Sequence, residues 1–241
     1  GMNRGGNMQE QYVLITGGTG GLGRTVTRMV LEAGVAGVTL PYRSRKCVDE
    51  LQAVLPSELL GRVQWVAADL HDERQVEAMV DAMPRTDVLL HLVGGFQMGA
   101  TDSFSFSAWQ QQLDQNLNST FLVCKHCLRR MRAQKYGRIV TVGSRGAVQP
   151  GANLAAYSAS KAGVVALTQA IAQETRERDL DITANVVLPS VIDTPKNRRD
   201  MGEENVWQWV TPESLGAVIL FLASPAARDV RGAAIPVYGK A

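Results

Sequence analysis

Tyr157 and Lys161 stand four residues apart in the segment Tyr157-Ser158-Ala159-Ser160-Lys161, and together they can carry proton-transfer chemistry. On a helix, residues with this spacing lie on the same face. A free phenol titrates near pH ~10, and a neighbouring ammonium ion favours the phenolate and lowers that pKa. The spacing therefore predicts a tyrosine that acts as a general acid or base near neutral pH. The alternative is a chance pairing on a solvated helix face.

Ser144 lies upstream of this pair, directly after a segment, 138–142, that is expected to be a strand. A hydroxyl at the end of a strand can hold a substrate oxygen while Tyr157 exchanges the proton. The three side chains together make a chance Tyr–Lys pairing a poor explanation of the pattern.

A glycine-rich turn, Thr16-Gly17-Gly18-Thr19-Gly20-Gly21-Leu22-Gly23, links the first expected strand to the first expected helix. Glycines let the backbone turn sharply and allow a pyrophosphate to come close to it. The helix that follows directs free N–H groups and its positive dipole end at that phosphate. The turn therefore predicts a dinucleotide site, although a plain strand-to-helix connection is the alternative. The binding residues expected here are Gly17, Thr19, Gly20, Gly21, Leu22 and Gly23.

Short apolar runs alternate with longer helical patterns along the chain. Strands are expected at 12–16, 38–42, 63–67, 88–93, 138–142, 182–188 and 233–237, and helices at 22–33, 47–55, 73–82, 107–133, 154–178 and 212–223. Continuous apolar strands separated by helices predict a parallel sheet covered on both faces. We expect one α/β domain, a Rossmann-type doubly wound parallel sheet of about seven strands with helices on both faces. It would span 11–241, after a tail, 1–10, that includes a scar of tag removal.

The composition is that of a water-soluble globular protein, with 241 residues, 45% hydrophobic and 20% charged. A net charge of +2 is too small to argue for nucleic acid, and no long apolar stretch predicts a membrane span. Three cysteines cannot form a disulfide framework, which favours a reduced, cytoplasmic setting. Cys124 and Cys127 form a C-x-x-C without a second pair, so we interpret them as core or interface residues and expect no metal site.

The glycine spacing T-G-x-x-x-G-x-G, followed by Ser144 and the Y-x-x-x-K motif, resembles the short-chain dehydrogenase/reductase family over nearly the whole chain. The resemblance implies that Tyr157 is the acid/base, that Ser144 orients the substrate oxygen and that Lys161 also binds the nicotinamide ribose. Asn116 resembles the fourth catalytic residue, which supports a proton-relay water near the lysine. The implied cofactor contacts further along the chain are Asp69, Leu70, Gly94, Pro189, Ile192 and Thr194. Family habit also implies a homotetramer or homodimer formed through the helices at 107–133 and 154–178.

The choice between NADP(H) and NAD(H) is normally made at the end of the second strand, where an acid binds the ribose of NAD. Here the strand ends in Pro41-Tyr42-Arg43-Ser44 without an acid. Arg43 can bind a 2′-phosphate in bidentate fashion and Ser44 can add a hydrogen bond, which favours NADP(H). A solvated basic cluster at a helix start is the alternative. Many NADP-dependent members of the family also carry a basic residue inside the glycine turn, where this chain has Gly20. Asp69, which resembles the residue that contacts the adenine, would otherwise be a helix cap.

The sequence departs from the family after the fourth strand, where His91-Leu92-Val93-Gly94 replaces the usual N-N-A-G. A histidine there is more often a core residue than a catalytic one. Val93-Gly94-Gly95-Phe96 and the segment 193–201 resemble the quinonoid dihydropteridine reductase branch, which typically lacks the serine and prefers NADH. The segment 190–210 is expected to cover the substrate, with apolar Met201, Trp207 and Trp209 beside two arginines.

The sequence thus predicts an NAD(P)(H)-dependent oxidoreductase that transfers hydride between NADP(H) and a small-molecule carbonyl or alcohol substrate. Two alternatives remain open. One is a quinonoid dihydropteridine reductase-like enzyme, and the other is a non-catalytic NAD(P)(H) sensor.

Overall fold

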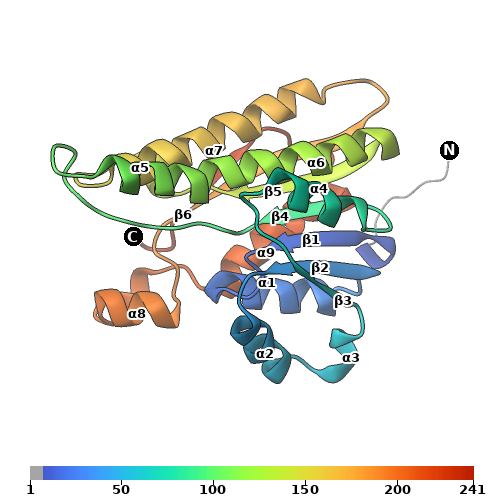
Figure 1. Cartoon of the computed structure of the whole chain (residues 1–241), viewed down its shortest axis with the longest axis horizontal. Helices are drawn as coiled ribbons and strands as arrows, with labels where there is room; N and C mark the ends of the chain where they lie inside the picture. Colours follow the sequence, from blue (N-terminus) through green and yellow to red (C-terminus); the bar gives the residue numbers. More distant parts are fainter. Residues whose placement is uncertain (1–7) are drawn as a thin grey trace.

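One parallel sheet forms the centre of the molecule, which is described here from a computed structural model of residues 8–241 (Figure 1). The strands lie in the order β3-β2-β1-β4-β5-β6-β7, which is the Rossmann-type arrangement predicted from the sequence. Their bounds are β1 Tyr12–Thr16, β2 Gly37–Tyr42, β3 Val63–Ala67, β4 Val88–His91, β5 Tyr136–Val142, β6 Asp181–Pro189 and β7 Ala234–Val237. The expected tag scar at Gly1 lies outside the described residues.

Helices cover both faces of the sheet, as predicted (Figure 1). On β1, Val13 and Ile15 pack into the cluster formed with α1 and α9, whereas Leu14 packs on the opposite side with α4 and α6. This alternation follows from the two-residue period of a strand. The helices are α1 Gly21–Glu32, α2 Arg45–Val54, α3 Ser57–Leu60, α4 Glu73–Asp81, α5 Phe106–Leu113, α6 Ser119–Gln134, α7 Ala155–Glu174, α8 Pro195–Met201 and α9 Pro212–Ala223.

The helix expected at 107–133 is not continuous. A π-helical turn, Asp114–Asn118, separates α5 from α6. At its centre the buried Asn116 exchanges two hydrogen bonds with the backbone of Gly95, 2.7 Å from its Oδ1 and 3.0 Å from its Nδ2. A π-turn adds a residue to the helical register, and such turns are frequent at functional sites.

Several further boundaries differ from the predictions, two of them at the ends of elements that border the site. The strand expected at 88–93 ends at His91, and the backbone N–H of Leu92 makes the last bond to β1, on Thr16 O. The helix expected at 154–178 ends at Glu174, and the short helices α3 and α8 were not predicted. The ends of helices and strands, and short helices of one or two turns, depend on local capping contacts that apolar periodicity does not reveal.

The carboxyl ends of all seven parallel strands lie at one edge of the sheet, and this edge positions the candidate site. The glycine turn follows β1, the segment 92–96 follows β4, Ser144 follows β5 and the segment 190–210 follows β6. Within residues 8–241, no helix is long and apolar enough to span a bilayer.

Candidate active site

The glycine turn is held tightly between the end of β1 and the start of α1. Gly17 has a φ of +70°, and a Cβ there would lie 2.9 Å from the Leu92 carbonyl carbon. A Cβ on Gly23 would lie only 1.8 Å from the Gly17 carbonyl oxygen. Gly20 is the N-cap of α1 without a side-chain cap, and both Gly20 and Gly21 are exposed. The first N–H groups of the helix therefore face solvent and can donate hydrogen bonds to the pyrophosphate of a dinucleotide.

Arg43 and Ser44 lie beside this turn, at the end of β2 and the start of α2. Both are exposed, and Ser44 is the N-cap of α2 although its hydroxyl caps no helix N–H. Asp69 follows β3, and its pKa is lowered mainly by the His71 backbone N–H, with a contribution from the charge of Arg43. Asp69 therefore lies near Arg43. The helix-cap alternative for Asp69 is wrong, because Asp72 caps α4 by accepting hydrogen bonds from Arg74 N and Gln75 N.

Tyr157 and Ser144 lie close together at the carboxyl end of β5, where a Cβ on Gly146 would lie 3.6 Å from Ser144 Oγ and 3.7 Å from Tyr157 Cε1. Ser144 is buried, and its Oγ accepts a hydrogen bond from the Gly146 backbone N–H at 3.1 Å. Burial raises the pKa of the Tyr157 phenol, and the polar Ser144 side chain opposes this rise. The sequence predicted a pKa lowered by Lys161, so the direction differs. Desolvation disfavours the phenolate, and it outweighs the favourable interaction that the structure supplies.

Lys161 lies one turn further along α7 and is buried. Its Nζ donates a hydrogen bond to the Val142 carbonyl oxygen at 3.0 Å, and burial lowers its pKa to about 8. A Cβ on Gly94 would lie 3.1 Å from this Nζ and 3.3 Å from Asn116 Oδ1, so both side chains border the same glycine. Asn116 Nδ2 also donates to Ser160 Oγ at 3.0 Å. The structure therefore brings together the four residues that the sequence nominated as catalytic.

His91 is a core residue that lies close to this group. Its Nδ1 is 2.7 Å from Thr16 Oγ1, and its buried Nε2 has no hydrogen-bond partner among the described residues. Burial, reinforced by the charge of Lys161, lowers the pKa of His91 from 6.5 to about 3. A charged imidazole is thus disfavoured here, as expected for a core histidine.

The lowered pKa of His91 makes the stability of the protein depend on pH. The unfolded chain takes up the proton below its pKa of 6.5, whereas the folded chain does so only near 3. The stabilisation is complete above pH 6.5 and is lost progressively as the pH falls toward 3. We expect the free energy of unfolding to drop by about 2 kcal/mol more between pH 7.5 and pH 5 than it does in His91→Asn. Urea denaturation at both pH values measures this difference, and equal drops in the two proteins would contradict it.

The segment after β6 reaches back to the glycine turn. Thr194 caps α8 by accepting a hydrogen bond from Asn197 N, and a Cβ on Gly21 would lie 2.9 Å from Thr194 Cγ2. Ile192 forms a β-bridge with Val210, which closes the base of the segment 190–210. Pro189 is the last residue of β6 and is buried. The residues expected at the nicotinamide end therefore lie along the same edge of the sheet.

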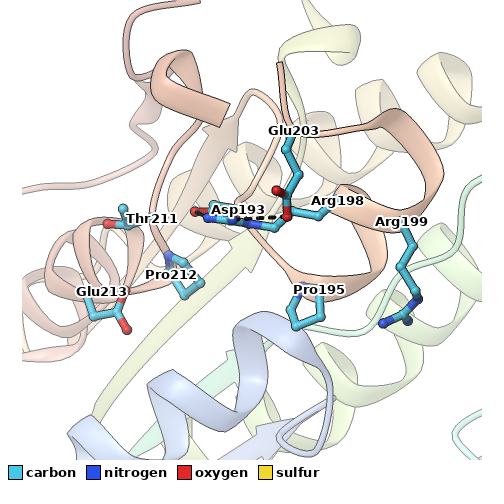
Figure 2. Close-up of a pocket in the computed structure, with 8 residues that line it drawn as sticks. All are labelled: Asp193, Pro195, Arg198, Arg199, Glu203, Thr211, Pro212 and Glu213. Carbon is cyan, nitrogen blue, oxygen red and sulfur yellow. Dashed lines mark hydrogen bonds and ion pairs between the residues drawn. The ribbon is translucent and has the colours of Figure 1, made fainter. Parts of the chain in front are cut away.

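A groove of about 630 Å³ runs between α8 and the start of α9, and Figure 2 shows α1 passing beneath it. Its acidic and basic side chains are partly paired. Arg198 binds both carboxylate oxygens of Asp193, at 2.6 and 2.8 Å, and also contacts Glu203 at 3.3 Å. Arg199, the second arginine expected beside the substrate, also lines the groove. This groove lies beside the glycine turn, and Tyr157 is not among its lining residues.

One apolar side chain, Phe96, lies against Tyr157. The Phe96 ring, which is 59% exposed, meets the Tyr157 ring edge-to-face with centroids 4.9 Å apart. Met201 and Trp207 are also exposed, as an apolar substrate cover would require, whereas Trp209 is partly buried. Sequence reasoning noted Phe96 only as part of a local resemblance. Its contact with the phenol depends on how the segment after β4 folds over α7.

One charged residue at the glycine turn was missed by the sequence analysis. Arg24, directly after Gly23, donates from Nε to the Thr19 carbonyl oxygen at 2.9 Å and pairs with Glu50 of α2 at 2.8 Å. A basic residue immediately after T-G-x-x-x-G-x-G was the available signal. The hydrogen bond from its side chain to the preceding Thr19 carbonyl could not be predicted from spacing.

Comparisons with known proteins agree with this geometry. The family model described as short chain dehydrogenase matches residues 11–205. An acetoacetyl-CoA reductase from an Acinetobacter strain is 29% identical, with 96% of this chain and 98% of the relative covered. A D-beta-hydroxybutyrate dehydrogenase from Cupriavidus necator is 28% identical, with 91% and 93% covered. The crystal structure of a variant actinorhodin polyketide ketoreductase with NADPH superposes with a TM-score of 0.85, at 27% identity and 97% coverage of both chains.

Proposed function

We propose that this chain, which belongs to the short-chain dehydrogenase family, is an NADP(H)-dependent carbonyl reductase or alcohol dehydrogenase with Tyr157 as its general acid/base. Family membership makes it an NAD(P)-dependent oxidoreductase of carbonyl or alcohol groups. The observation that carries the assignment of the acid/base is the placement of the Ser144 hydroxyl and the Tyr157 ring around the same glycine, Gly146, with Tyr157 on the helix that also bears buried Lys161.

The proposed mechanism assigns each side chain one task. The nicotinamide ring, when bound, supplies hydride to the carbonyl carbon or removes it from the alcohol. In the reductive direction, Ser144 donates a hydrogen bond to the substrate oxygen, and Tyr157 donates its phenolic proton to the same atom. The raised pKa of Tyr157 keeps that proton in place at neutral pH. In the oxidative direction, Tyr157 takes the hydroxyl proton back.

Lys161 and Asn116 are proposed to support this proton transfer. The Lys161 ammonium would bind the nicotinamide ribose and stabilise the phenolate that forms when Tyr157 gives up its proton. Asn116 holds Gly95 with two hydrogen bonds, which fixes the backbone that borders Lys161. The remaining parts of the cofactor would be held along the edge of the sheet by the glycine turn and Gly94. Pro189, Ile192 and Thr194 would contact its nicotinamide end, and Asp69 and Leu70 its adenine end.

The preference for NADP(H) rests on the polar and cationic groups next to the adenosine end of the site. Arg43 is exposed where β2 ends, the Ser44 hydroxyl caps no helix N–H, and no acid directly follows Tyr42. Hydrogen bonds to charged groups contribute about 1.5–3 kcal/mol each. A 2′-phosphate bound by Arg43 and Ser44 would therefore distinguish NADP(H) from NAD(H).

Titration calorimetry with NADPH and NADH tests this preference. We expect Arg43→Ala to weaken NADPH binding by about 10- to 100-fold and to change NADH binding little, because only NADPH carries the 2′-phosphate. Arg45→Ala is a matched control, since Arg45 is already 3.7 Å from Asp49 within the same helix. Tighter binding of NADH by the wild type would contradict the preference, and binding of neither cofactor would contradict the proposed use of the site.

A flat pterin substrate is a second candidate, favoured by one observation. The exposed Phe96 ring lies against Tyr157, where it would stack on a planar ring presented to the phenol. A screen of carbonyl compounds with NADPH should therefore include quinonoid dihydropterins. The sensor alternative has no comparable support, because the relatives carry oxidoreductase names.

Assembly, location and the substrate loop are also proposed. The exposed rings of Phe106 on α5 and Phe121 on α6 support a homodimer or homotetramer, and a monomer in sedimentation analysis would contradict it.

Three free cysteines support a reduced, cytoplasmic setting, which cell fractionation tests. The segment 190–210 is proposed to cover a small-molecule substrate.

A further inference from the structure

Arg24 bridges the two segments that border the proposed 2′-phosphate site. It stands on the first turn of α1, and its Nε donates a hydrogen bond to the Thr19 carbonyl oxygen in the glycine turn at 2.9 Å. Its NH2 group binds Glu50 Oε2 on α2 at 2.8 Å. Helix α2 starts directly after Arg43 and Ser44. The Arg24 side chain is 40% exposed, so solvent and ligands can reach it.

The position of Arg24 supplies the charge that the glycine turn itself lacks. Gly20 stands at the place in the turn where many NADP-dependent members of the family carry a basic residue, and it has no side chain. The Arg24 guanidinium instead donates a hydrogen bond to the carbonyl oxygen of Thr19, the residue that precedes Gly20. Arg43 is exposed at the end of β2, two residues before the start of α2, the helix whose Glu50 pairs with Arg24.

We propose that Arg24 is the second cation of the 2′-phosphate site and that Glu50 holds it when no phosphate is bound. The inference rests on the proposed preference for NADP(H). On binding, the guanidinium would exchange the Glu50 carboxylate for the phosphate, whose oxygens match its paired N–H groups. No bond is made or broken in this exchange other than hydrogen bonds.

Two features make the exchange favourable. The Arg24–Glu50 pair is about 40% exposed on both sides, and ion pairs in contact with water contribute little to stability. Lys46 lies 4.0 Å from the other oxygen of Glu50 and is 85% exposed, so it can keep the carboxylate paired after Arg24 leaves. The other nearby pair, Arg45 with Asp49 at 3.7 Å, is unaffected by the exchange.

Glu50 then becomes a determinant of cofactor specificity. Its charge competes with the 2′-phosphate for Arg24 and does not affect a ligand without that phosphate. Replacing Glu50 by glutamine should release Arg24 and strengthen the binding of 2′-phosphorylated ligands alone. If Arg24 were only a brace between α1 and α2, removing Glu50 would loosen the site and weaken every nucleotide.

The experiment compares 2′,5′-ADP with 5′-AMP by titration calorimetry, because the two ligands differ only in the 2′-phosphate. We expect Arg24→Gln to weaken 2′,5′-ADP by about tenfold and 5′-AMP hardly at all. Glu50→Gln should strengthen 2′,5′-ADP by a few-fold, and the double variant should match Arg24→Gln alone. Arg28→Gln is the control, since Arg28 lies one turn further along α1 and pairs with Glu32 at 3.8 Å.

The possible failures are distinguishable. Equal weakening of both ligands by Arg24→Gln, with a lower melting temperature, would make Arg24 a structural brace and overturn the inference. Weaker 2′,5′-ADP binding in Glu50→Gln would overturn the partner exchange. If the wild type did not prefer 2′,5′-ADP to 5′-AMP, the proposed cofactor preference would itself fail. If Arg43→Ala abolished that preference and Arg24→Gln did not, only the role of Arg24 would be wrong.

Discussion

Tyr157→Phe is expected to lower kcat about 10³-fold while leaving NADPH affinity and the melting temperature nearly unchanged. Phenylalanine keeps the ring that packs against Phe96 but lacks the hydroxyl that donates the proton. Ser144 Oγ keeps its hydrogen bond from the Gly146 N–H, so the site should retain its shape. Steady-state turnover of a carbonyl substrate, together with calorimetric titration of NADPH, measures both quantities.

Tyr136→Phe is the matched control for this substitution. Tyr136 is also partly buried, but its hydroxyl accepts a hydrogen bond from Gln11 at the opposite end of β5. Its loss should leave turnover nearly intact and affect only stability. Unchanged turnover in Tyr157→Phe would show that another group moves the proton, whereas equal losses in both variants would point to a general structural effect.

The second large effect is expected at the glycine turn. In Gly23→Ala the new Cβ would lie 1.8 Å from the Gly17 carbonyl oxygen and 2.8 Å from Gly18 Cα, and both contacts are with backbone. Rotation of a side chain cannot relieve them, so α1 must move away from the turn. We expect a loss of about 3 kcal/mol in the free energy of unfolding and weaker NADPH binding, because the helix N–H groups lose their alignment.

Gly61→Ala provides the comparison for Gly23→Ala. Gly61 ends α3 with a φ of −62°, and a Cβ there would meet nothing within 4 Å. Its free energy of unfolding should stay within about 1 kcal/mol of the wild type. Urea denaturation and NADPH titration apply to both variants. A Gly23→Ala protein as stable as Gly61→Ala, with wild-type affinity for NADPH, would disprove the close packing of the turn.

Local sequence patterns were sufficient to predict the sheet and its order of elements. The nearly continuous apolar runs of β1 and β4 identify strands buried on both faces, because a strand with one face in water alternates apolar and polar residues. Boundaries were predicted less well. The π-turn at Asp114–Asn118, for example, depends on the bond between Asn116 and Gly95, which are 21 residues apart in the sequence.

Residue types and spacings also determined which side chains could carry the chemistry. Ser144, Tyr157 and Lys161 were identified in this way, because the ordinary pKa values of a phenol and an ammonium group follow from residue type alone. Helical spacing placed Tyr157 and Lys161 on one face, and both stand on α7. The sequence alone thus defined the candidate acid/base group and the dinucleotide turn.

Only the tertiary structure decided how these groups are tuned and what surrounds them. Burial, which depends on packing between distant segments, raises the pKa of Tyr157 where the sequence predicted a decrease. Burial likewise lowers the pKa of His91 and keeps it neutral beside Lys161. Arg24 donates a hydrogen bond to the Thr19 carbonyl and forms an ion pair with Glu50, and the ion pair requires α1 and α2 to lie side by side. Desolvation and long-range contacts arise only when the chain is folded, so spacing along the sequence cannot specify them.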